Sequence, residues 1–203
     1  MHIPQGETQT LDILSFEEAS ILSTSESYDR THWIYVPDFY TEYRYVLGTR
    51  GKHPVICVGI NPSTAEPDHL DPTLKSVARI AEGNGYDSWL MFNVYAQRAT
   101  KPDDMDTVRN EKLHSENMQA FQKLLMMSSS KEEVPVIWAA WGAIIEKRSW
   151  LIDCIREMAD LAAQFHSEWV CAGERSKAGH PHHPLYLKKT EHFRTFEIGE
   201  YLK

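Results

Sequence analysis

Four short runs of apolar residues recur along the chain, separated by segments in which the apolar positions follow a helical spacing. The runs are residues 55–60 (VICVGI), 89–94 (WLMFNV), 134–140 (VPVIWAA) and 169–172 (WVCA). Continuous apolar runs of this length are typical of strands that are covered on both faces. We therefore predict four buried strands that alternate with helices.

The segments between these runs carry helix signals. Asp71 precedes Pro72, which is the order of an N-cap and a first helical residue, and residues 83–85 (GNG) end the same segment. Residues 101–127 and 144–165 have apolar stripes of their own. Alternating strands and helices predict an α/β fold: a three-layer α/β/α sandwich with a central, mostly parallel four-stranded sheet.

The amino-terminal part has a different pattern. Aromatic and β-branched residues dominate residues 33–50, and residues 48–51 (GTRG) supply turn chemistry, so we predict an N-terminal hairpin. Residues 1–30 are polar and serine-rich, which predicts a loosely packed extension. Residues 31–203 are then a single predicted domain, since 203 residues with 42% hydrophobic content suffice for one core.

The cysteines and the lengths of the apolar runs indicate which cellular environment to expect for the protein. Cys57, Cys154 and Cys171 are odd in number and lie in apolar segments, so we predict packed, reduced thiols. No apolar run approaches the roughly 18 to 20 residues of a membrane span. The first ten residues also lack the basic and apolar regions of a signal peptide. We therefore expect a cytoplasmic protein that does not contact a membrane.

The net charge of −8 disfavours a protein that depends on broad electrostatic attraction to nucleic-acid phosphates. A local basic patch is compatible with that charge. Basic residues flank the segments that carry candidate chemistry, namely Arg44, Arg50, Lys52, Arg98, Lys101, Lys177, Lys188 and Lys189.

Candidate chemistry lies in the loops after the predicted strands, because ligands of parallel sheets bind beyond the carboxyl ends of the strands. Asn61 follows the first strand and Asn93 closes the second. Each amide has two open interpretations: it satisfies its own loop, or it holds a water or a base. His180, His182 and His183 follow the last strand. One interpretation is that these histidines belong to a surface loop made rigid by its prolines. The other is that a histidine donates a hydrogen bond to a substrate oxygen that gains negative charge in the transition state. Their spacing lacks the helical HExxH or paired-cysteine pattern that is typical of a metal site.

Taken in order, these loops resemble the motifs of the uracil-DNA glycosylase superfamily over residues 43–187. Residues 58–63 (VGINPS) are similar to the water-activating motif of its mismatch-specific branch, and residues 91–94 (MFNV) to its base-recognising asparagine. Residues 138–143 (WAAWGA) are similar to its strand and turn, and residues 183–186 (HPLY) to its terminal histidine motif. The set NPSTA, DPT, FNVYAQRAT, WG and HPLYL also resembles a bacterial and phage family known only as a domain of unknown function.

The resemblance implies hydrolysis of the N-glycosidic bond of a damaged or modified base in DNA, with the base flipped out of the duplex. Asn61 would position the water, Asn93 would read the base, and His183 would stabilise the departing base. Water activation would be slow, because the most active members carry Asp where this chain has Asn61. Further implied substrate contacts are Pro62, Ser63, Tyr95, His180 and Leu185, with Tyr45 as a second stacking candidate. The resemblance implies no cofactor and no metal.

Several alternatives stay open at this stage. His180-Pro181 and His183-Pro184 both fit the terminal histidine motif. The acidic charge favours binding or hydrolysis of a free nucleotide or nucleoside, and Asn61 in place of Asp favours a non-catalytic, partner-binding module. The expected partner is a nucleobase-containing ligand, and DNA is one form of it. We interpret Asp71 as a helix cap and Asp68 as solvated, and the sequence predicts no oligomeric state.

Overall fold

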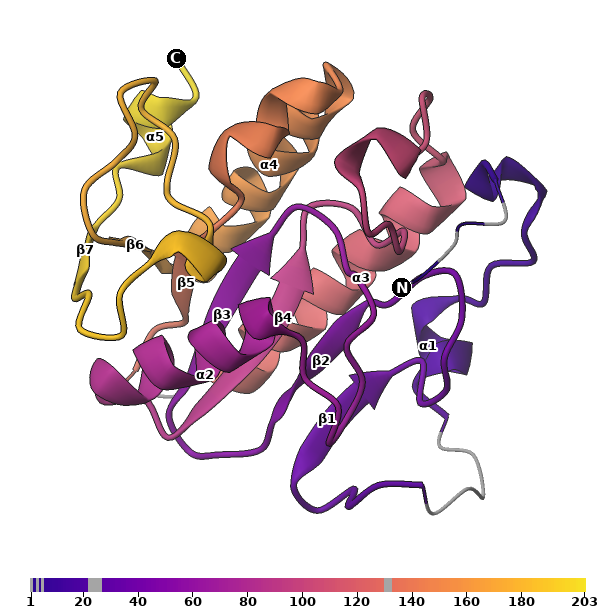
Figure 1. The fold of residues 1–203 in the computed structure, drawn as a ribbon, viewed down its shortest axis with the longest axis horizontal. Helices are drawn as coiled ribbons and strands as arrows, with labels where there is room; N and C mark the ends of the chain where they lie inside the picture. Colours follow the sequence, from indigo (N-terminus) through magenta and orange to yellow (C-terminus); the bar gives the residue numbers. More distant parts are fainter. Residues whose placement is uncertain (1, 3, 5, 22–26, 130–132) are drawn as a thin grey trace.

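The computed structural model describes residues 2, 4, 6–21, 27–129 and 133–203, and these residues form one mixed sheet of seven strands (Figure 1). The strand order is β1-β2-β4-β3-β5-β6-β7. The strands are β1 (Trp33–Val36), β2 (Val46–Thr49), β3 (Pro54–Gly59), β4 (Ser88–Asn93), β5 (Val136–Ala139), β6 (Glu168–Ala172) and β7 (Phe193–Thr195).

The four predicted strands form the parallel centre of the sheet, in the order β4-β3-β5-β6. The prediction of a four-stranded sheet is wrong, however, because three antiparallel strands extend its edges. β2 pairs with β4 on one side, and β7 pairs with β6 on the other. β7 is three residues long and mostly exposed, so its sequence carries no buried apolar run that would have marked it.

β1 and β2 pair antiparallel, with Trp33 opposite Thr49, so the predicted hairpin is confirmed. The turn that we predicted at residues 48–51 is misplaced, because Gly48 and Thr49 belong to β2 itself. Gly48 lies opposite Leu90 of β4, and a Cβ on Gly48 would collide with backbone atoms of β4. This glycine therefore permits a close approach of two strands, and residues 37–45 make the connection between β1 and β2.

The α-helices are α1 (Phe16–Ala19), α2 (Pro72–Gly83), α3 (Glu111–Ser128), α4 (Trp150–Ala163) and α5 (Ile198–Tyr201). Short 3-10 segments are η1 (Thr8–Thr10), η2 (Pro102–Asp104), η3 (Gly142–Lys147) and η4 (Pro184–Tyr186). The Asp71 side chain accepts a hydrogen bond from Leu74 N at 2.9 Å, which confirms the predicted cap of α2. None of the helices in the described part of the chain is both long and apolar enough to cross a membrane.

Two predicted helices are shorter than their apolar patterns indicated. α3 begins only after Asn110, whose side chain accepts from Leu113 N, so most of residues 101–110 is loop. The helix predicted over residues 144–165 is divided into η3 and α4. The break falls at Arg148, which has an extended backbone and donates to the carbonyls of Asp103, Met105 and Asp106.

Helices cover both faces of the sheet. β3 alternates between them: Val55 and Cys57 pack in the cluster that contains α2, whereas Ile56 and Val58 pack in the cluster that contains α1, α3 and α4. Figure 1 shows α2 in front of the sheet and α3 and α4 behind it. The protein is therefore a mixed α/β fold with a mostly parallel central sheet and helices on both sides.

The described residues near the amino terminus are packed more tightly than their composition predicts. Thr8, Ile13 and Ala19 are buried. Thr8 N donates to Asp106 Oδ1 at 2.8 Å, and the Thr8 hydroxyl donates to the other oxygen of the same carboxylate. These contacts attach the segment to the loop before α3.

Candidate functional site

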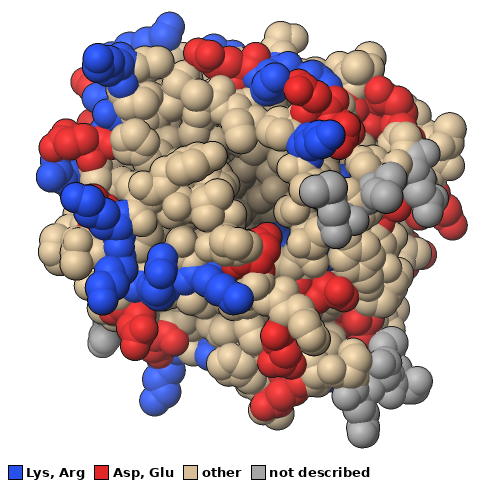
Figure 2. All heavy atoms as spheres, in the orientation of Figure 1, with Lys and Arg blue, Asp and Glu red and all other residues tan. Residues whose placement is uncertain are grey.

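The carboxyl ends of the central strands form a depression on the face that carries α2. In the register of the sheet, Gly59 lies opposite Asn93, and Val58 lies opposite Ala139 of β5. These strands therefore end at the same level. Figure 2 shows a deep hollow near the carboxyl ends of β3 and β4, and the loops after the strands carry the candidate residues around it.

Asn93, the last residue of β4, has a fully buried side chain without a partner. Neither Oδ1 nor Nδ2 of Asn93 forms a hydrogen bond within the described residues, and the residue is 0% exposed. A Cβ on Gly59 would lie 3.1 Å from Asn93 Oδ1, so the glycine leaves room for the amide. A buried, unpaired amide costs free energy that a ligand with matching donor and acceptor groups would recover.

Asn61 follows β3, and its amide has one fixed orientation. Asn61 Nδ2 donates to Ala99 O at 2.7 Å and to Pro62 O at 3.0 Å. The interpretation that Asn61 satisfies its own loop is therefore correct for the NH2 group. The same bonds fix Oδ1 as a free acceptor, since it has no partner within the described residues, and the side chain is half-buried. This oxygen can accept a hydrogen bond from a water.

Two buried arginines hold the loop that follows Asn61. Arg44 Nη1 donates to Ala65 O at 3.1 Å. Arg98 Nη1 donates to the carbonyls of Ser63 and Ala65, and its guanidinium lies 4.2 Å from the centre of the Tyr40 ring. Arg44 is 1% exposed and Arg98 is 0% exposed. The sequence marked these residues only as charges near the candidate loops, because burial of an arginine depends on contacts that are distant along the chain.

Pro62 and the backbone of Ser63 shape this loop, and the Ser63 hydroxyl forms no hydrogen bond within the described residues. Pro62 is buried and Ser63 is half-buried. The Pro62 carbonyl accepts from Ala99 N at 2.9 Å as well as from Asn61. Ser63 contributes its carbonyl to Arg98. The loop therefore has the fixed backbone that a positioned water site requires.

His183 lies beside the turn after β5 and has one uncommitted ring nitrogen. A Cβ on Gly142 would be 3.4 Å from His183 Cβ, and His183 Nδ1 accepts from Leu185 N at 3.4 Å. Burial lowers the pKa of His183 below its ordinary value, although the Asp71 carboxylate opposes this shift. The imidazole is therefore neutral at pH 7 and carries its hydrogen on Nε2, which has no partner within the described residues and can donate to a ligand.

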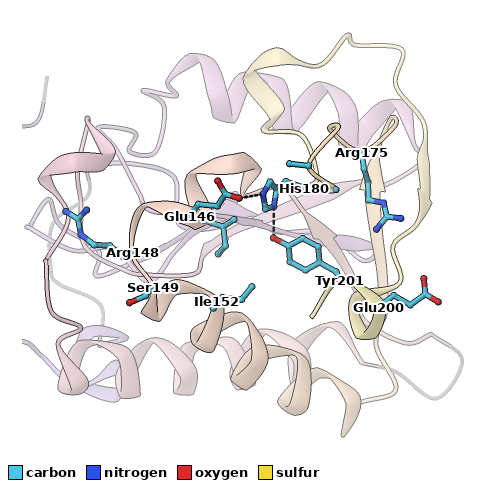
Figure 3. Close-up of a pocket in the computed structure, with 11 residues that line it drawn as sticks. Glu146, Arg148, Ser149, Ile152, Arg175, His180, Glu200 and Tyr201 are labelled. Atoms are coloured by element: carbon cyan, nitrogen blue, oxygen red, sulfur yellow. Dashed lines mark hydrogen bonds and ion pairs between the residues drawn. The ribbon is translucent and has the colours of Figure 1, made fainter. Parts of the chain in front are cut away.

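His180 has different neighbours and no free ring nitrogen. It lines a pocket of about 490 Å³ between η3, α4 and the carboxyl-terminal segment (Figure 3). Trp141 Nε1 donates to the Tyr201 hydroxyl at 3.1 Å, that hydroxyl is 2.9 Å from His180 Nδ1, and His180 Nε2 is 3.0 Å from Glu146 Oε1. In the neutral imidazole, the Tyr201 hydroxyl donates to Nδ1 and Nε2 donates to Glu146.

This difference bears on the open choice between the two histidines. Protein groups occupy both ring nitrogens of His180, so it is unsuited to contact a substrate directly. Ser149 lines the same pocket. No hydrogen bond joins Ser149 to His180 in the described structure, so the group lacks the nucleophile and base contact of a hydrolase triad. His183 is the better match for a substrate-contacting histidine.

The two tyrosines that we considered for stacking lie in the opposite part of the core. Tyr95 and Tyr45 are both 0% exposed and belong to the cluster around α3. The Tyr95 hydroxyl donates to Asp106 and accepts from Asn110 N, and the Tyr45 hydroxyl donates to Leu14 O. Neither ring can stack on a ligand in the hollow, so the assignment of Tyr95 as a substrate contact is wrong in this structure.

Basic and apolar side chains gather on one side of the hollow. In Figure 2, Lys and Arg side chains lie over α2 along this side. We call the exposed residues Lys75 and Arg79 on α2 and Lys188 and Lys189 after η4 the basic strip. Figure 2 also shows acidic side chains at the edge of the hollow. Leu185 and Tyr186 of η4 are 44% and 80% exposed. Leu185, which we predicted as a substrate contact, is thus an exposed apolar residue two positions after His183.

Other residues singled out from the sequence have structural partners. Asp68 is not merely solvated, since its Oδ1 accepts from Trp33 Nε1 at 3.0 Å and its φ is 62°. Cys57, Cys154 and Cys171 are buried free thiols, as predicted. Among the described residues, no group of three or more His, Cys, Asp or Glu is arranged to hold a metal ion.

A family model for a protein of unknown function (DUF1643) matches residues 44–185. The chain belongs to the DUF1643 family. The match begins at Arg44 and ends at Leu185, so Asn61, Asn93 and His183 all lie within the DUF1643 segment. Tyr201, which holds His180, lies outside it. No curated protein and no solved structure matches the chain, and the resemblance to uracil-DNA glycosylases remains a prediction.

Proposed function

We propose that this DUF1643 protein binds a nucleobase in the hollow beyond β3 and β4 and hydrolyses its N-glycosidic bond. The observation that carries the proposal is the Asn93 amide, which is fully buried and has no partner for either Oδ1 or Nδ2. Natural proteins rarely leave such a group unpaired, and the exceptions concentrate at functional sites.

The Asn93 amide has the hydrogen-bonding pattern of a pyrimidine edge. It offers one acceptor and two donor hydrogens side by side, which match an N–H next to a carbonyl oxygen on the base. Gly59 faces this amide from the neighbouring strand, and the absence of a Cβ there lets the amide and the Met91 side chain approach that strand closely. Recognition of a polar edge by a buried amide also discriminates against bases whose edges leave it unpaired.

The other two residues supply the chemistry of bond cleavage. Asn61 Oδ1 holds a water whose oxygen forms a bond to C1′ of the sugar while the bond from C1′ to the base nitrogen breaks. The base leaves with the bonding electrons and takes up a proton from the water. The neutral His183 Nε2–H donates to the base oxygen that gains negative charge, which stabilises the transition state more than the ground state.

The substrate in this proposal is a base in DNA, and the exposed basic strip and apolar residues beside the hollow support it. Lys75, Arg79, Lys188 and Lys189 form that strip. Leu185 and Tyr186 would press against a duplex from which the base is flipped. A second candidate is a free nucleotide, which the net charge of −8 favours because a small ligand requires no extended basic surface.

The test is release of free base, measured by chromatography. Substrates are duplexes with uracil, mismatched thymine or modified bases, and the corresponding nucleosides and nucleotides. Asn61→Ala and His183→Asn should each lower release by about 100-fold or more, because single positioned groups contribute on this order. His180→Asn serves as the matched control and should retain activity, since both nitrogens of His180 bind other protein groups.

Two results would overturn the proposal. Base release that survives both substitutions would place the chemistry elsewhere. If no substrate is cleaved and no nucleobase raises the melting temperature, the hollow is not a base site and a non-catalytic module is the better description.

A further inference from the structure

Arg44 and Arg98 form a buried pair of cations without an acidic partner. Both are at most 1% exposed, and no carboxylate in the described residues lies within ion-pair distance of either guanidinium. Of its five N–H donors, Arg44 uses one, on Ala65 O. The Nε atoms of both arginines are buried and unpaired.

An arrangement of this kind is costly. Buried charges in proteins are normally paired, and the loss of a partner for a buried ion is strongly destabilising. Burial, followed by repulsion from Arg98, lowers the pKa of Arg44 to about 9. Support of the Ser63 and Ala65 carbonyls explains three hydrogen bonds, but a neutral amide would satisfy a carbonyl as well. Arg98 also donates to the Tyr35 hydroxyl at 3.0 Å and lies over the Tyr40 ring, so its charge has an aromatic neighbour. The positive charge of Arg44 has no counterpart of this kind among its contacts with the described residues.

The pair lies at the same end of the sheet as Asn93. Arg44 N donates to Ala96 O, three residues beyond Asn93, at 2.9 Å. The Arg44 guanidinium contacts the loop between β3 and α2 at Ala65 O, and the Arg98 guanidinium contacts the same loop at Ser63 O, two residues after Asn61. Both guanidinium groups therefore lie against the loop that follows Asn61.

We propose that Arg44 and Arg98 form a phosphate subsite, so that the ligand of the hollow is a nucleoside phosphate. This inference rests on the proposed function for the base-bearing part, and it favours the second candidate substrate, a free nucleotide, over a base in DNA. A guanidinium binds phosphate oxygens through two parallel hydrogen bonds, and Arg44 has donors free for this purpose. A phosphate below the protein surface is more accessible to a mononucleotide than to a polymer strand, so a nucleoside monophosphate is the expected form.

The experiment measures binding by calorimetry and thermal shift at constant ionic strength. The probes are inorganic phosphate, a panel of nucleosides, their monophosphates and a single-stranded oligonucleotide. We expect a monophosphate to bind about 10- to 100-fold more tightly than its nucleoside, which is the range for hydrogen bonds to a charged group. Arg44→Gln should remove this advantage and leave nucleoside affinity unchanged. Asn93→Leu should do the reverse and weaken the nucleoside but not inorganic phosphate.

Two further variants separate a loss of phosphate binding from a general loss of stability. Arg44→Lys retains the charge without the forked geometry, so it folds more readily and should lose part of the phosphate advantage. Arg156→Gln is the matched control, because Arg156 is a half-exposed arginine on α4 that pairs with Asp153. Arg156→Gln should change neither the affinity for nucleosides nor that for monophosphates. Any rise in its melting temperature with inorganic phosphate measures the general stabilising effect of phosphate salts.

The outcomes separate this inference from the proposed function. Phosphate binding that depends on Arg44, without any nucleoside binding, would support the subsite and refute the base pocket. Equal affinity for nucleosides and monophosphates would refute the subsite and leave the base pocket standing. If only the oligonucleotide shows an Arg44-dependent advantage, the phosphate belongs to a strand. If phosphate stabilises the wild type and both Arg44 variants equally, the arginines serve the loop alone.

Discussion

Replacement of Asn93 by leucine should stabilise the unliganded protein and abolish base binding. Leucine has the branched shape of asparagine and carries no polar atoms. In the unliganded protein both amide atoms of Asn93 are buried and unpaired, so the substitution removes a desolvation penalty and creates no cavity of note. An unsatisfied buried polar atom costs about 1–3 kcal/mol. We therefore expect a gain of at least about 1 kcal/mol in the free energy of unfolding, even where a water offsets part of that penalty.

Asn117→Leu is the matched control, because Asn117 is about as deeply buried but its NH2 group is used, whereas neither amide atom of Asn93 has a partner among the described residues; the Asn117 Oδ1 is also unpaired there. Asn117 Nδ2 donates to Asn93 O at 2.9 Å and to Val94 O at 3.4 Å. Its replacement leaves two backbone carbonyls without these donors, which costs about 1–3 kcal/mol. The two Asn→Leu variants should thus differ by roughly 2–6 kcal/mol, in opposite directions from the wild type.

Urea denaturation followed by circular dichroism measures these differences. For a chain of 203 residues, 1 kcal/mol corresponds to about 2–4 °C in melting temperature, so a thermal scan resolves the two variants. If Asn93→Leu destabilises the protein as much as Asn117→Leu does, the Asn93 amide has partners in solution. Asn93 would then be a structural residue, and the principal observation behind the proposed function would be lost.

Three further predictions follow from other contacts. Gly48→Ala should cost about 1–3 kcal/mol or more in urea denaturation, because its Cβ would meet the β4 backbone, whereas Gly199→Ala in α5 meets nothing within 4 Å and should not destabilise the protein. Thr8→Val should cost about 1–3 kcal/mol and speed proteolysis of the amino-terminal segment, because Asp106 and Asn110 lose a buried partner; equal proteolysis rates would contradict this. Burial depresses the pKa of His183 from 6.5, so stability that is complete above pH 6.5 should fall as the pH drops, and His183→Asn should flatten this slope between pH 7.5 and 5.5.

The sequence predicted the centre of the fold because its signals are local. An apolar run such as residues 55–60 marks a strand covered on both faces, and Asp71-Pro72 marks a helix start, without reference to any other part of the chain. β7 was missed because a short, exposed strand has no such signal. The hairpin turn was misplaced because residues 48 and 49 have turn-like types but belong to the buried strand β2. Gly48 is an example: the same residue suits a turn or a close approach of strands, and only its neighbour Leu90 decides between them.

The candidate site shows the same division. The sequence predicted that Asn61 and Asn93 lie at strand ends, because one directly follows an apolar run and the other closes one. The sequence did not predict whether an amide or an imidazole lacks hydrogen-bond partners, because those partners come from distant segments. His180 and His183 are three residues apart and identical in motif, yet Glu146 and Tyr201 occupy one of them and leave the other open. The two buried arginines were missed for the same reason.

The distribution of satisfied and unsatisfied polar groups is therefore the strongest physical argument for the site. Tyr95, Asp106 and Asn110 form a buried network whose members bond to one another, as expected for groups that serve stability. At equal depth in the described part of the chain, both amide atoms of Asn93 have no partner, and Arg44 has an unpaired Nε and a single hydrogen bond, to Ala65 O. A fold that satisfies one buried network can satisfy another, so the unpaired amide and the underused guanidinium are explained most directly by a ligand that brings the missing groups. The fully paired His180 needs no such explanation, and the substrate contacts should be sought around Asn93 instead.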